Sequence, residues 1–372
     1  MPLSRRELLA SAPLWTVGCA LRRSAIKPPA PLPVARVRVA PERVIRTIVG
    51  LRPFRPSGFV VRVEKLDDKI VIHNYGHGGA GITLSWGTAQ LSVMEAAQAE
   101  TRQAAVIGCG VVGLSTARLL QQRGYTVTIY AKAMPPDTTS NVAGGLWDPV
   151  TIYDHQHVTP EFRRQFAEAG RFAFRRYESL VGEAYGVRWL PLYSLSRDSA
   201  HQPPPPESPY SEIESLYSDS RQLSRAKHPF DVPFVYRRYS MLIEPAIYLN
   251  ALLRDFLTAK GNLIVREFRD TRELASLSES LLFNCTGLGS RELFHDDELI
   301  PVKGQLLFLL PQPEIDYMTV GPGDIYMFPR RDGVLLGGSH ERGVWDTEVD
   351  PATTDRILSE NAALFASLRQ RG

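Results

Sequence analysis

Three glycines at fixed spacing are the clearest chemical signal in the sequence. Residues 108–113 (GCGVVG) match the pattern G-x-G-x-x-G. In this pattern the first glycine allows a tight turn, the second lets the backbone approach a pyrophosphate, and the third lets a helix pack on a strand. The free N–H groups and the dipole at the start of that helix favour an anion. The pattern predicts a dinucleotide site; the alternative is a strand-to-helix turn without a ligand.

The residue that would contact the ribose bears on which dinucleotide binds. NAD sites place an acidic residue about 20 positions after the first glycines, where it holds the ribose hydroxyls. This chain has Tyr130, Ala131 and Lys132 in that place. Because a lysine would favour a 2′-phosphate, this motif alone leaves NADP open.

An arginine followed by a proline is the second candidate. In residues 50–56 (GLRPFRP) both arginines precede a proline, which disfavours a helix and keeps the segment extended. Such a segment could aim Arg52 into a cavity. The alternative is a surface arginine on an edge strand.

A stretch rich in glycine and histidine is the third candidate. Residues 73–83 (HNYGHGGAGIT) precede a predicted helix, and they form a second helix N-terminus open to an anion or a flavin. His73 and His77 would need further ligands to hold a metal, and no cysteine or acidic residue lies near them in the sequence. We therefore expect no metal site.

These candidate residues need strands and helices to position them. Hydrophobic patterns predict a strand, a helix and a strand at residues 104–107, 112–122 and 126–130, which together form a βαβ unit. Only residues 98–103 join the preceding helix, residues 82–97, to the first of these strands, so that helix should lie antiparallel against the sheet. Further helices are predicted at residues 159–178, 247–259 and 351–368, and strands at residues 44–63, 70–72, 263–267, 281–287, 305–310, 325–328 and 334–338.

The composition is that of a globular protein large enough for two domains. Of the 372 residues, 44% are hydrophobic and 22% charged. The net charge of +3 is too small to indicate a nucleic-acid partner, and no stretch has the roughly 18 consecutive apolar residues of a transmembrane span. The three cysteines, Cys19, Cys109 and Cys285, indicate neither a disulfide framework nor a metal cluster.

The N-terminal segment resembles an export signal. Residues 4–9 (SRRELL) are similar to a twin-arginine signal and precede a weakly apolar stretch. We expect residues 1–25 to be this signal and residues 26–43 an extended linker, which places the protein in the periplasm or elsewhere outside the cytoplasm. Residues 16–19 loosely resemble a lipoprotein cleavage box ending at Cys19, without the usual leucine. The alternative is a cytoplasmic protein with a basic N-terminus.

Six blocks of this sequence resemble the D-amino-acid oxidase and D-aspartate oxidase family. They are HNYGHGGAGIT, GLRPFRP, VIGCGVVGLST, TTSNVAGGLW, LLFNCTG and IYMFPRRDGVLLGG. In that family the glycine turn opens the chain, and the GLRPFRP and HNYGHGG blocks close it. Here those two blocks come first, as in a circular permutation. Permutation requires that the original ends lie close together, so residues 368–372 should lie near residues 44–48.

The resemblance implies a circularly permuted α/β fold with two discontinuous domains. A Rossmann-like FAD-binding domain would comprise residues 68–150 and 247–295. A substrate-binding domain on a large mixed β-sheet would comprise residues 44–67, 151–246 and 296–372.

The resemblance also implies the roles of individual residues. Arg52 would pair with the substrate carboxylate, Tyr326 would help to hold it, and Gly79 would present backbone to the substrate amine. FAD would be bound non-covalently by Gly108, Gly110, Val111, Val112, Gly113, Ala131, Lys132, Thr138, Thr139, Ser140, Gly144, Gly145, Leu146, Phe268, Gly78, Gly79, Gly81, Ile82 and Thr83.

Three positions depart from the family pattern and bear on the substrate side chain. Pro322 stands where the family has a second pocket tyrosine, which predicts a different flap, and Asp148 replaces a glutamine common near the pocket. His340 occupies the position where aspartate-preferring members have an arginine, with Arg342 close by. Both neutral and acidic substrates therefore stay open.

The activity that the resemblance implies is FAD-dependent oxidation of D-amino acids. Direct hydride transfer to the flavin, with dioxygen as the acceptor, would yield 2-oxo acids, ammonia and hydrogen peroxide. Two alternatives are a dehydrogenase that uses an acceptor other than oxygen, and a flavin-binding protein without turnover. The oligomeric state is left open.

Overall fold

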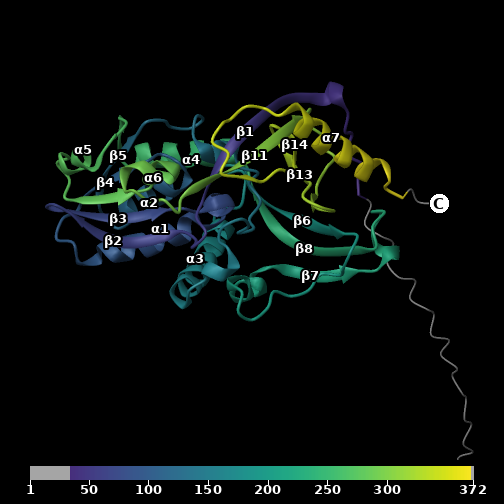
Figure 1. Cartoon of the computed structure of the whole chain (residues 1–372), viewed down its shortest axis with the longest axis horizontal. Helices are drawn as coiled ribbons and strands as arrows, with labels where there is room; N and C mark the ends of the chain where they lie inside the picture. Colours follow the sequence, from purple (N-terminus) through teal and green to yellow (C-terminus); the bar gives the residue numbers. More distant parts are fainter. Residues whose placement is uncertain (1–33, 370–372) are drawn as a thin grey trace, which may run out of the picture.

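The computed structural model describes residues 34–369 of the chain, which form two β-sheets that lie end to end (Figure 1). The predicted signal, residues 1–25, and Cys19 lie outside the described residues, so the export prediction stays a prediction. Within the described part, no helix is long and apolar enough to cross a membrane.

The first sheet has six strands in the order β2-β3-β10-β4-β5-β9. Its neighbouring strands are parallel except for β2 and β3, which form an antiparallel hairpin. The central strands are buried almost throughout, as expected for parallel strands with helices on both faces. The strands are β2 (Val60–Leu66), β3 (Lys69–Tyr75), β4 (Gln103–Ile107), β5 (Thr126–Ala131), β9 (Asn262–Val265) and β10 (Leu281–Asn284).

Helices cover both faces of this sheet. Helices α1 (Gly81–Glu95) and α2 (Val111–Gln122) pack side by side, with α3 (Pro160–Glu178) against α1 and α4 (Pro245–Thr258) against α2. A Cβ on Gly87 of α1 would lie 2.0 Å from the Ala169 carbonyl oxygen of α3, so only glycine permits this close approach. The short helices α5 (Thr271–Ala275) and α6 (Ser290–Leu293) contribute Leu274 and Leu293 to a separate core cluster with residues of β3, β4 and β10.

The second sheet has nine strands. Eight of them follow the order β1-β11-β14-β13-β12-β6-β8-β7, and β15 pairs with β11. The strands are β1 (Val44–Phe54), β6 (Val187–Ser196), β7 (Ser218–Leu223), β8 (Phe234–Ile243), β11 (Ile300–Leu309), β12 (Met318–Val320), β13 (Tyr326–Arg330), β14 (Gly333–Gly337) and β15 (Glu341–Arg342).

The two faces of the nine-stranded sheet have different cores. Helix α7 (Pro351–Ala366) covers one face, where Leu307 and Leu336 pack in the same cluster as Leu364 of the helix. Leu306 and Leu335, one position earlier on the same strands, pack in a different cluster. This alternation is that of a β-strand, and it leaves the face opposite α7 for the functional site.

The predicted elements of the βαβ unit and the long helices are confirmed to within a few residues. Helix α3 begins after Thr159, whose hydroxyl accepts a hydrogen bond from the Phe162 N–H (3.1 Å), and α7 begins after Asp350, which caps it in the same way. The sequence pattern does not predict strands β6, β7, β8, β12 and β15.

The chain passes between the two sheets earlier than the sequence suggests. Our predicted boundary at residue 67 differs from the structure, in which β2 already belongs to the six-stranded sheet. The physical reason is the two-residue turn at Asp67 and Asp68, which forces β2 to pair with β3.

Residues 34–43, the described part of the predicted linker, pack against the nine-stranded half of the protein. Val37 is buried, and Arg38 exchanges hydrogen bonds with Gln312. The Arg36 side chain donates to the Leu368 carbonyl oxygen (3.1 Å), and Val44 and Leu368 belong to one hydrophobic cluster. The end of α7 therefore lies beside the segment that enters β1, as a permuted order requires. The permutation itself stays our proposal.

Candidate functional site

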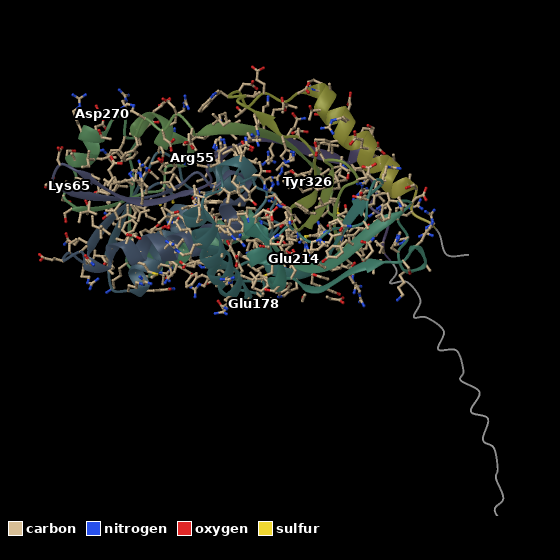
Figure 2. The ribbon with its side chains drawn as sticks, turned by 60° about the horizontal axis from the view of Figure 1, so that its bottom comes forward. Arg55, Lys65, Glu178, Glu214, Asp270 and Tyr326 are labelled. Carbon is tan, nitrogen blue, oxygen red and sulfur yellow. The ribbon has the colours of Figure 1, made fainter. Side chains whose placement is uncertain are left out.

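A cavity of about 830 Å³ is lined by residues of both sheets. At one end lie the glycine turn before α2 and the segment after β9. At the other end lie β1, β11 and β13, with Arg52 and Tyr326. Figure 2 shows Tyr326 in the half built on the nine-stranded sheet, and Lys65 and Asp270 at the far end of the other half. The cavity thus joins the predicted cofactor and substrate residues.

The three glycines of the turn differ in what a side chain would meet at each position. Gly108 has a φ of +114°, and a Cβ there would lie 2.5 Å from the Cys285 carbonyl oxygen. A Cβ on Gly113 would lie 2.0 Å from the Gly108 carbonyl oxygen, so Gly113 permits helix α2 to approach the turn. A Cβ on Gly110 would meet only the Ser140 hydroxyl, at 3.2 Å, so Gly110 keeps the cavity open.

The start of α2 provides the donors that a pyrophosphate needs. The first N–H groups of a helix have no acceptor within the helix, and those of α2 lie at the cavity wall, where Val111 and Val112 are lining residues. The Ser140 hydroxyl accepts from the Val111 N–H (3.0 Å) and so fixes the loop against this helix end. The size of the cavity and the open approach at Gly110 fit a dinucleotide such as FAD.

Most of the predicted cofactor residues line this cavity. They are Gly108, Gly110, Val111, Val112, Ala131, Lys132, Thr138, Thr139, Ser140, Gly144, Phe268, Gly78, Gly79, Gly81 and Ile82. Their placement is what the resemblance predicts, and their contacts with a cofactor stay predictions.

Four predicted cofactor residues do not line the cavity. One is Gly113, whose role in packing is given above. A Cβ on Gly145 would lie 2.1 Å from the Ile243 carbonyl oxygen, and Leu146 forms a bridge with Leu242. The buried Thr83 hydroxyl lies within hydrogen-bond distance of the Leu146 carbonyl oxygen (3.4 Å). These residues hold the walls together rather than facing a ligand.

Strand pairing places Arg52 on the face of the sheet that bounds the cavity. Arg52 of β1 pairs with Val302 of β11, which lies two residues before Gly304. Paired residues, and residues two apart on one strand, share a face. A Cβ on Gly304 would lie 2.2 Å from an Arg52 guanidinium nitrogen. The guanidinium therefore lies directly over a glycine.

Tyr326 reaches the same face through two further pairings. Tyr326 of β13 pairs with Gly337 of β14, which in turn pairs with Leu306 of β11. Leu306 lies two residues beyond Gly304, so all these positions share one face. A Cβ on Gly337 would lie 2.1 Å from the Tyr326 ring. The structure thus brings Arg52 and Tyr326 together over a floor made of two glycines.

The charge of Arg52 is available to a ligand. Among residues 34–369, no carboxylate forms an ion pair with Arg52, and its contact with the Ser339 carbonyl oxygen is long (3.4 Å). Burial raises the pKa of the Tyr326 hydroxyl, and the neighbouring Arg52 guanidinium partly opposes this effect. The phenol therefore stays protonated and can donate a hydrogen bond next to an uncompensated positive charge.

The second arginine of the same motif has a different environment. Arg55 forms an ion pair with Asp296 (2.8 Å) and with Glu298 (3.2 Å), and Tyr75 also donates to Asp296 (2.8 Å). These contacts fasten the end of β1 to the loop after α6. Arg55 is thus neutralised in place, which leaves Arg52 as the arginine of this motif that can bind an anion.

The two histidines before α1 serve the core. His77 lies within hydrogen-bond distance of the Thr88 hydroxyl (2.9 Å), and burial lowers the pKa of His77 to about 3. Burial also lowers the pKa of His73 to about 4, although the Glu64 carboxylate (3.1 Å) acts in the opposite direction. Within the described residues no group of His, Cys, Asp and Glu forms a metal site.

The positions that depart from the family pattern bear differently on the pocket. The Asp148 carboxylate pairs with Arg238 (2.7 Å) and accepts from Tyr217 (2.8 Å), and it does not line the cavity. Arg342 forms two hydrogen bonds with the Asp154 carboxylate, at 2.7 and 2.9 Å.

The other two departures are His340 and Pro322, and neither lines the cavity. Burial lowers the pKa of His340, and the charge of the nearby Arg52 lowers it further. Pro322 lies in the five-residue connection between β12 and β13, and the Gly321 N–H and the Ile325 carbonyl oxygen close this connection (2.7 Å). At the position where the resemblance predicts a flap different from that of the family, this chain has a short hairpin.

Sequence reasoning missed several residues that line the cavity. They are chiefly Asn74, Arg266, Glu267, Arg269, Gly304, Leu306, Thr347 and residues 285–289. Residues 266–269 and 285–289 follow the parallel strands β9 and β10. Ligands of open α/β sheets bind beyond the carboxyl ends of the strands, and this rule could have identified these two segments from the strand predictions alone. Gly304 and Thr347 carry no such signal.

Comparisons with known proteins find FAD-dependent oxidoreductases. A family model described as "FAD dependent oxidoreductase" matches residues 103–371. The D-amino-acid oxidase of Rubrobacter xylanophilus is 33% identical over 72% of this chain and 78% of its own length. The D-aspartate oxidase of Homo sapiens is 30% identical over 72% of this chain and 77% of its own. Among solved structures, glycine oxidase from Geobacillus kaustophilus has a TM-score of 0.53 at 17% identity, covering 73% of this chain and 81% of that one, and it shows the fold.

Proposed function

The chain belongs to the family of FAD-dependent oxidoreductases that includes D-amino-acid oxidase and D-aspartate oxidase, and on this premise we propose that it catalyses the oxidative deamination of D-amino acids. The products would be 2-oxo acids, ammonia and hydrogen peroxide. The observation that carries this proposal is the convergence of Arg52 and Tyr326 at one end of a cavity whose other end is a dinucleotide-binding turn. The two relatives with the highest identities given above act on D-amino acids.

Arg52 would bind the substrate carboxylate. Its planar guanidinium matches a carboxylate with two parallel hydrogen bonds, and it is always charged. Because no carboxylate of the described chain neutralises it, an incoming carboxylate gains the full interaction. The Gly304 floor lets the guanidinium lie flat against the sheet, which fixes the direction of the fork.

Tyr326 would donate a further hydrogen bond to the carboxylate and so fix its orientation. Its hydroxyl is a further donor beside Arg52 on the same face, and its ring stacks on Phe328 at a centroid distance of 5.0 Å. A rigid donor beside a charged fork holds a small substrate in one orientation, and such positioning supplies much of the rate enhancement in reactions of this kind. FAD, when bound, supplies the chemistry by accepting the substrate hydride and passing the electrons to dioxygen.

The backbone at Gly79 would hold the substrate amine. Gly79 lines the cavity, and its N–H donates to the Thr151 carbonyl oxygen (2.9 Å). A Cβ at this position would lie 2.7 Å from the Val150 carbonyl oxygen, so a side chain would displace the wall. Gly79 thus brings polar backbone to the cavity where a side chain could not fit.

Two described cavity residues that could be considered as proton acceptors for the amine, His77 and Tyr326, are unsuited to that role. His77 faces the Thr88 hydroxyl and stays neutral, and burial raises the pKa of Tyr326. The substrate amine would therefore enter in its neutral form, with its proton lost to solvent. Orientation and electrostatics, rather than a general base, would account for the rate.

A peroxide assay tests this proposal. Purified yellow protein should release hydrogen peroxide and ammonia in equal amounts with at least one member of a panel of D-amino acids that includes D-alanine and D-aspartate, and not with the L-enantiomers; achiral glycine is assayed beside the panel. Flavin bleaching without peroxide under air would indicate an acceptor other than oxygen. A flavin that no D-amino acid bleaches under anaerobic conditions would contradict the proposal.

A further inference from the structure

The adenosine end of the cavity lacks the acidic residue that its motif calls for. Strand β5 ends at Ala131, and Lys132 stands where a ribose-binding carboxylate is expected. A lysine alone at this point would favour a phosphate over two neutral hydroxyl groups. The family, however, uses FAD, whose adenosine ribose carries free hydroxyls. Some other group must therefore bind that ribose.

A carboxylate from another strand lies at this position. Strand β9 pairs with β5 in parallel, and Ala131 is opposite Val265. The chain beyond β9 consequently runs beside the chain beyond β5. There the Lys132 ammonium donates to a Glu267 carboxylate oxygen at 3.2 Å, and both residues line the cavity.

The neighbours of Glu267 form a platform suited to an adenine ring. Phe268 is buried and packs edge-on against Tyr130, with ring centroids 5.9 Å apart. The Arg266 guanidinium lies 4.6 Å from the centre of the Phe268 ring. Aromatic and guanidinium planes are surfaces on which bases stack. A base held here would bring its ribose to the Lys132–Glu267 pair.

We propose that Glu267 is the residue that binds the adenosine ribose hydroxyls of FAD, and that Lys132 positions its carboxylate. The acidic function that usually ends the second strand of the βαβ unit is thus supplied by the strand next to it. A carboxylate is acceptor-only and can take a hydrogen bond from each of two adjacent hydroxyls. Because Lys132 is paired with Glu267, its charge is balanced and the site rejects a 2′-phosphate.

Binding of nucleotide fragments to the FAD-free protein tests the proposal without any turnover. Calorimetry gives the Kd for ADP and for 2′-deoxy-ADP, and the ratio of the two measures the contribution of the 2′-hydroxyl to binding. The wild-type protein should bind ADP about 10- to 100-fold more tightly, the discrimination that a hydrogen bond to a charged group provides. Glu267→Gln should reduce this ratio to about fivefold, the discrimination that a neutral hydrogen bond of about 1 kcal/mol provides, and Glu267→Ala should abolish it.

A charge reversal and a matched control complete the test. Adenosine 2′,5′-bisphosphate should bind the wild-type protein more weakly than AMP, which differs from it only in lacking the 2′-phosphate, and Glu267→Lys should reverse that order because two lysines then face the 2′-position. Glu292→Gln, which alters another carboxylate lining the same cavity, should leave both ratios unchanged. Lys132→Ala should lower the ADP ratio only in part.

Three results would overturn the proposal. They are an unchanged ratio of ADP to 2′-deoxy-ADP in Glu267→Ala, the loss of that ratio in Glu292→Gln, and unaltered discrimination against the 2′-phosphate in Glu267→Lys. Glu267 and Lys132 are both largely exposed, at 60% and 71%, so these variants should fold. Unchanged thermal unfolding of each variant would verify this.

Discussion

The two ends of the cavity would recognise their ligands with different parts of the chain. At the dinucleotide end, the turn at residues 108–113 and the start of α2 present backbone N–H groups, and glycines keep side chains out of the way. At the carboxylate end, Arg52 and Tyr326 present side chains from two strands that are far apart in the sequence. Glycines occur at both ends, but at the second they support side chains rather than backbone.

Because of this difference, one end of the cavity would bind the cofactor and the other would orient the substrate. Backbone donors at a helix start attract any phosphate and are fixed by the local fold. A guanidinium and a phenol on one rigid face select one shape of anion and fix its direction. Changes at one end should therefore affect FAD binding, and changes at the other should affect turnover, with little effect of either on the other function.

Removing the guanidinium should have the largest effect. We expect Arg52→Ala to lower kcat/KM roughly 30- to 3,000-fold, because loss of one partner of a desolvated charge pair costs about 2–5 kcal/mol. The flavin should stay bound, as shown by its visible absorption after gel filtration. Arg46→Ala, on the same strand but paired with Asp332, is the matched control and should be nearly silent. Equal losses in both variants would remove Arg52 from the account.

A methyl group in the glycine turn should weaken FAD binding and leave substrate binding unchanged, the opposite of the effect of Arg52→Ala. Gly108→Ala would place a Cβ 2.5 Å from the Cys285 carbonyl oxygen at a φ of +114°, a strain of about 1–3 kcal/mol. The Kd for FAD should rise roughly tenfold or more, while the KM for the amino acid at saturating FAD stays near that of the wild type. Gly124→Ala, with positive φ but no atom within 4 Å, is the control. If FAD affinity falls equally in Gly124→Ala, the close contact at the turn is not its cause.

Loss of the phenol hydroxyl should have a smaller effect than loss of Arg52. Tyr326→Phe keeps the stacked ring and removes one donor, so kcat/KM should fall roughly tenfold, within the range for a hydrogen bond to a charged group. Because burial raises the pKa of Tyr326, the wild-type activity should show no loss from phenol ionisation below about pH 10. Tyr317→Phe, on the opposite face of the sheet with its hydroxyl bonded to Ala35, should change nothing. A wild-type kcat/KM for Tyr326→Phe would show that the Tyr326 hydroxyl does not help Arg52 to hold the carboxylate.

Acid should destabilise the six-stranded half through its buried histidines. The pKa of His77 is lowered from 6.5 to about 3 and that of His73 to about 4. The unfolded chain therefore binds more protons than the folded chain between these values and 6.5, so stability falls as the pH decreases through that window. The denaturant midpoint should decrease from pH 6.5 to pH 4, less steeply in His77→Gln.

Another buried histidine limits how much of the pH dependence His77→Gln should remove. The buried His228, in the half with the nine-stranded sheet, also has a pKa lowered to about 4, so His77→Gln should leave part of the slope in place. An identical slope in the variant and the wild type would show that His77 does not carry this effect.

The sequence predicted the dinucleotide end better than the carboxylate end, for a physical reason. The strand, turn and helix around residues 104–122 interact with their neighbours along the chain, so their spacing alone defines the site. The contact of Arg52 with Tyr326 depends on the register of β1, β11, β14 and β13, which the residues of one strand do not encode. From the residues alone, a surface side chain was the stronger interpretation of Arg52.

Long-range pairing also explains what sequence reasoning missed. Glu267 approaches Lys132 because β9 lies beside β5, and β9 is separated from β5 by the whole of the segment containing α3, β6 and β8. The glycine floor at Gly304 and Gly337 has no local signature, since isolated glycines in strands have several uses. Burial of Asp148 against Arg238 likewise follows from packing that the sequence pattern does not show.

A crystal structure of the FAD-loaded protein with an unreactive carboxylate, such as benzoate, tests the central claim most directly. The carboxylate should lie over Gly304, with both oxygens accepting hydrogen bonds from the Arg52 guanidinium and one also accepting from the Tyr326 hydroxyl. A carboxylate bound away from Arg52, or a Tyr326 hydroxyl that faces away from it, would contradict the account.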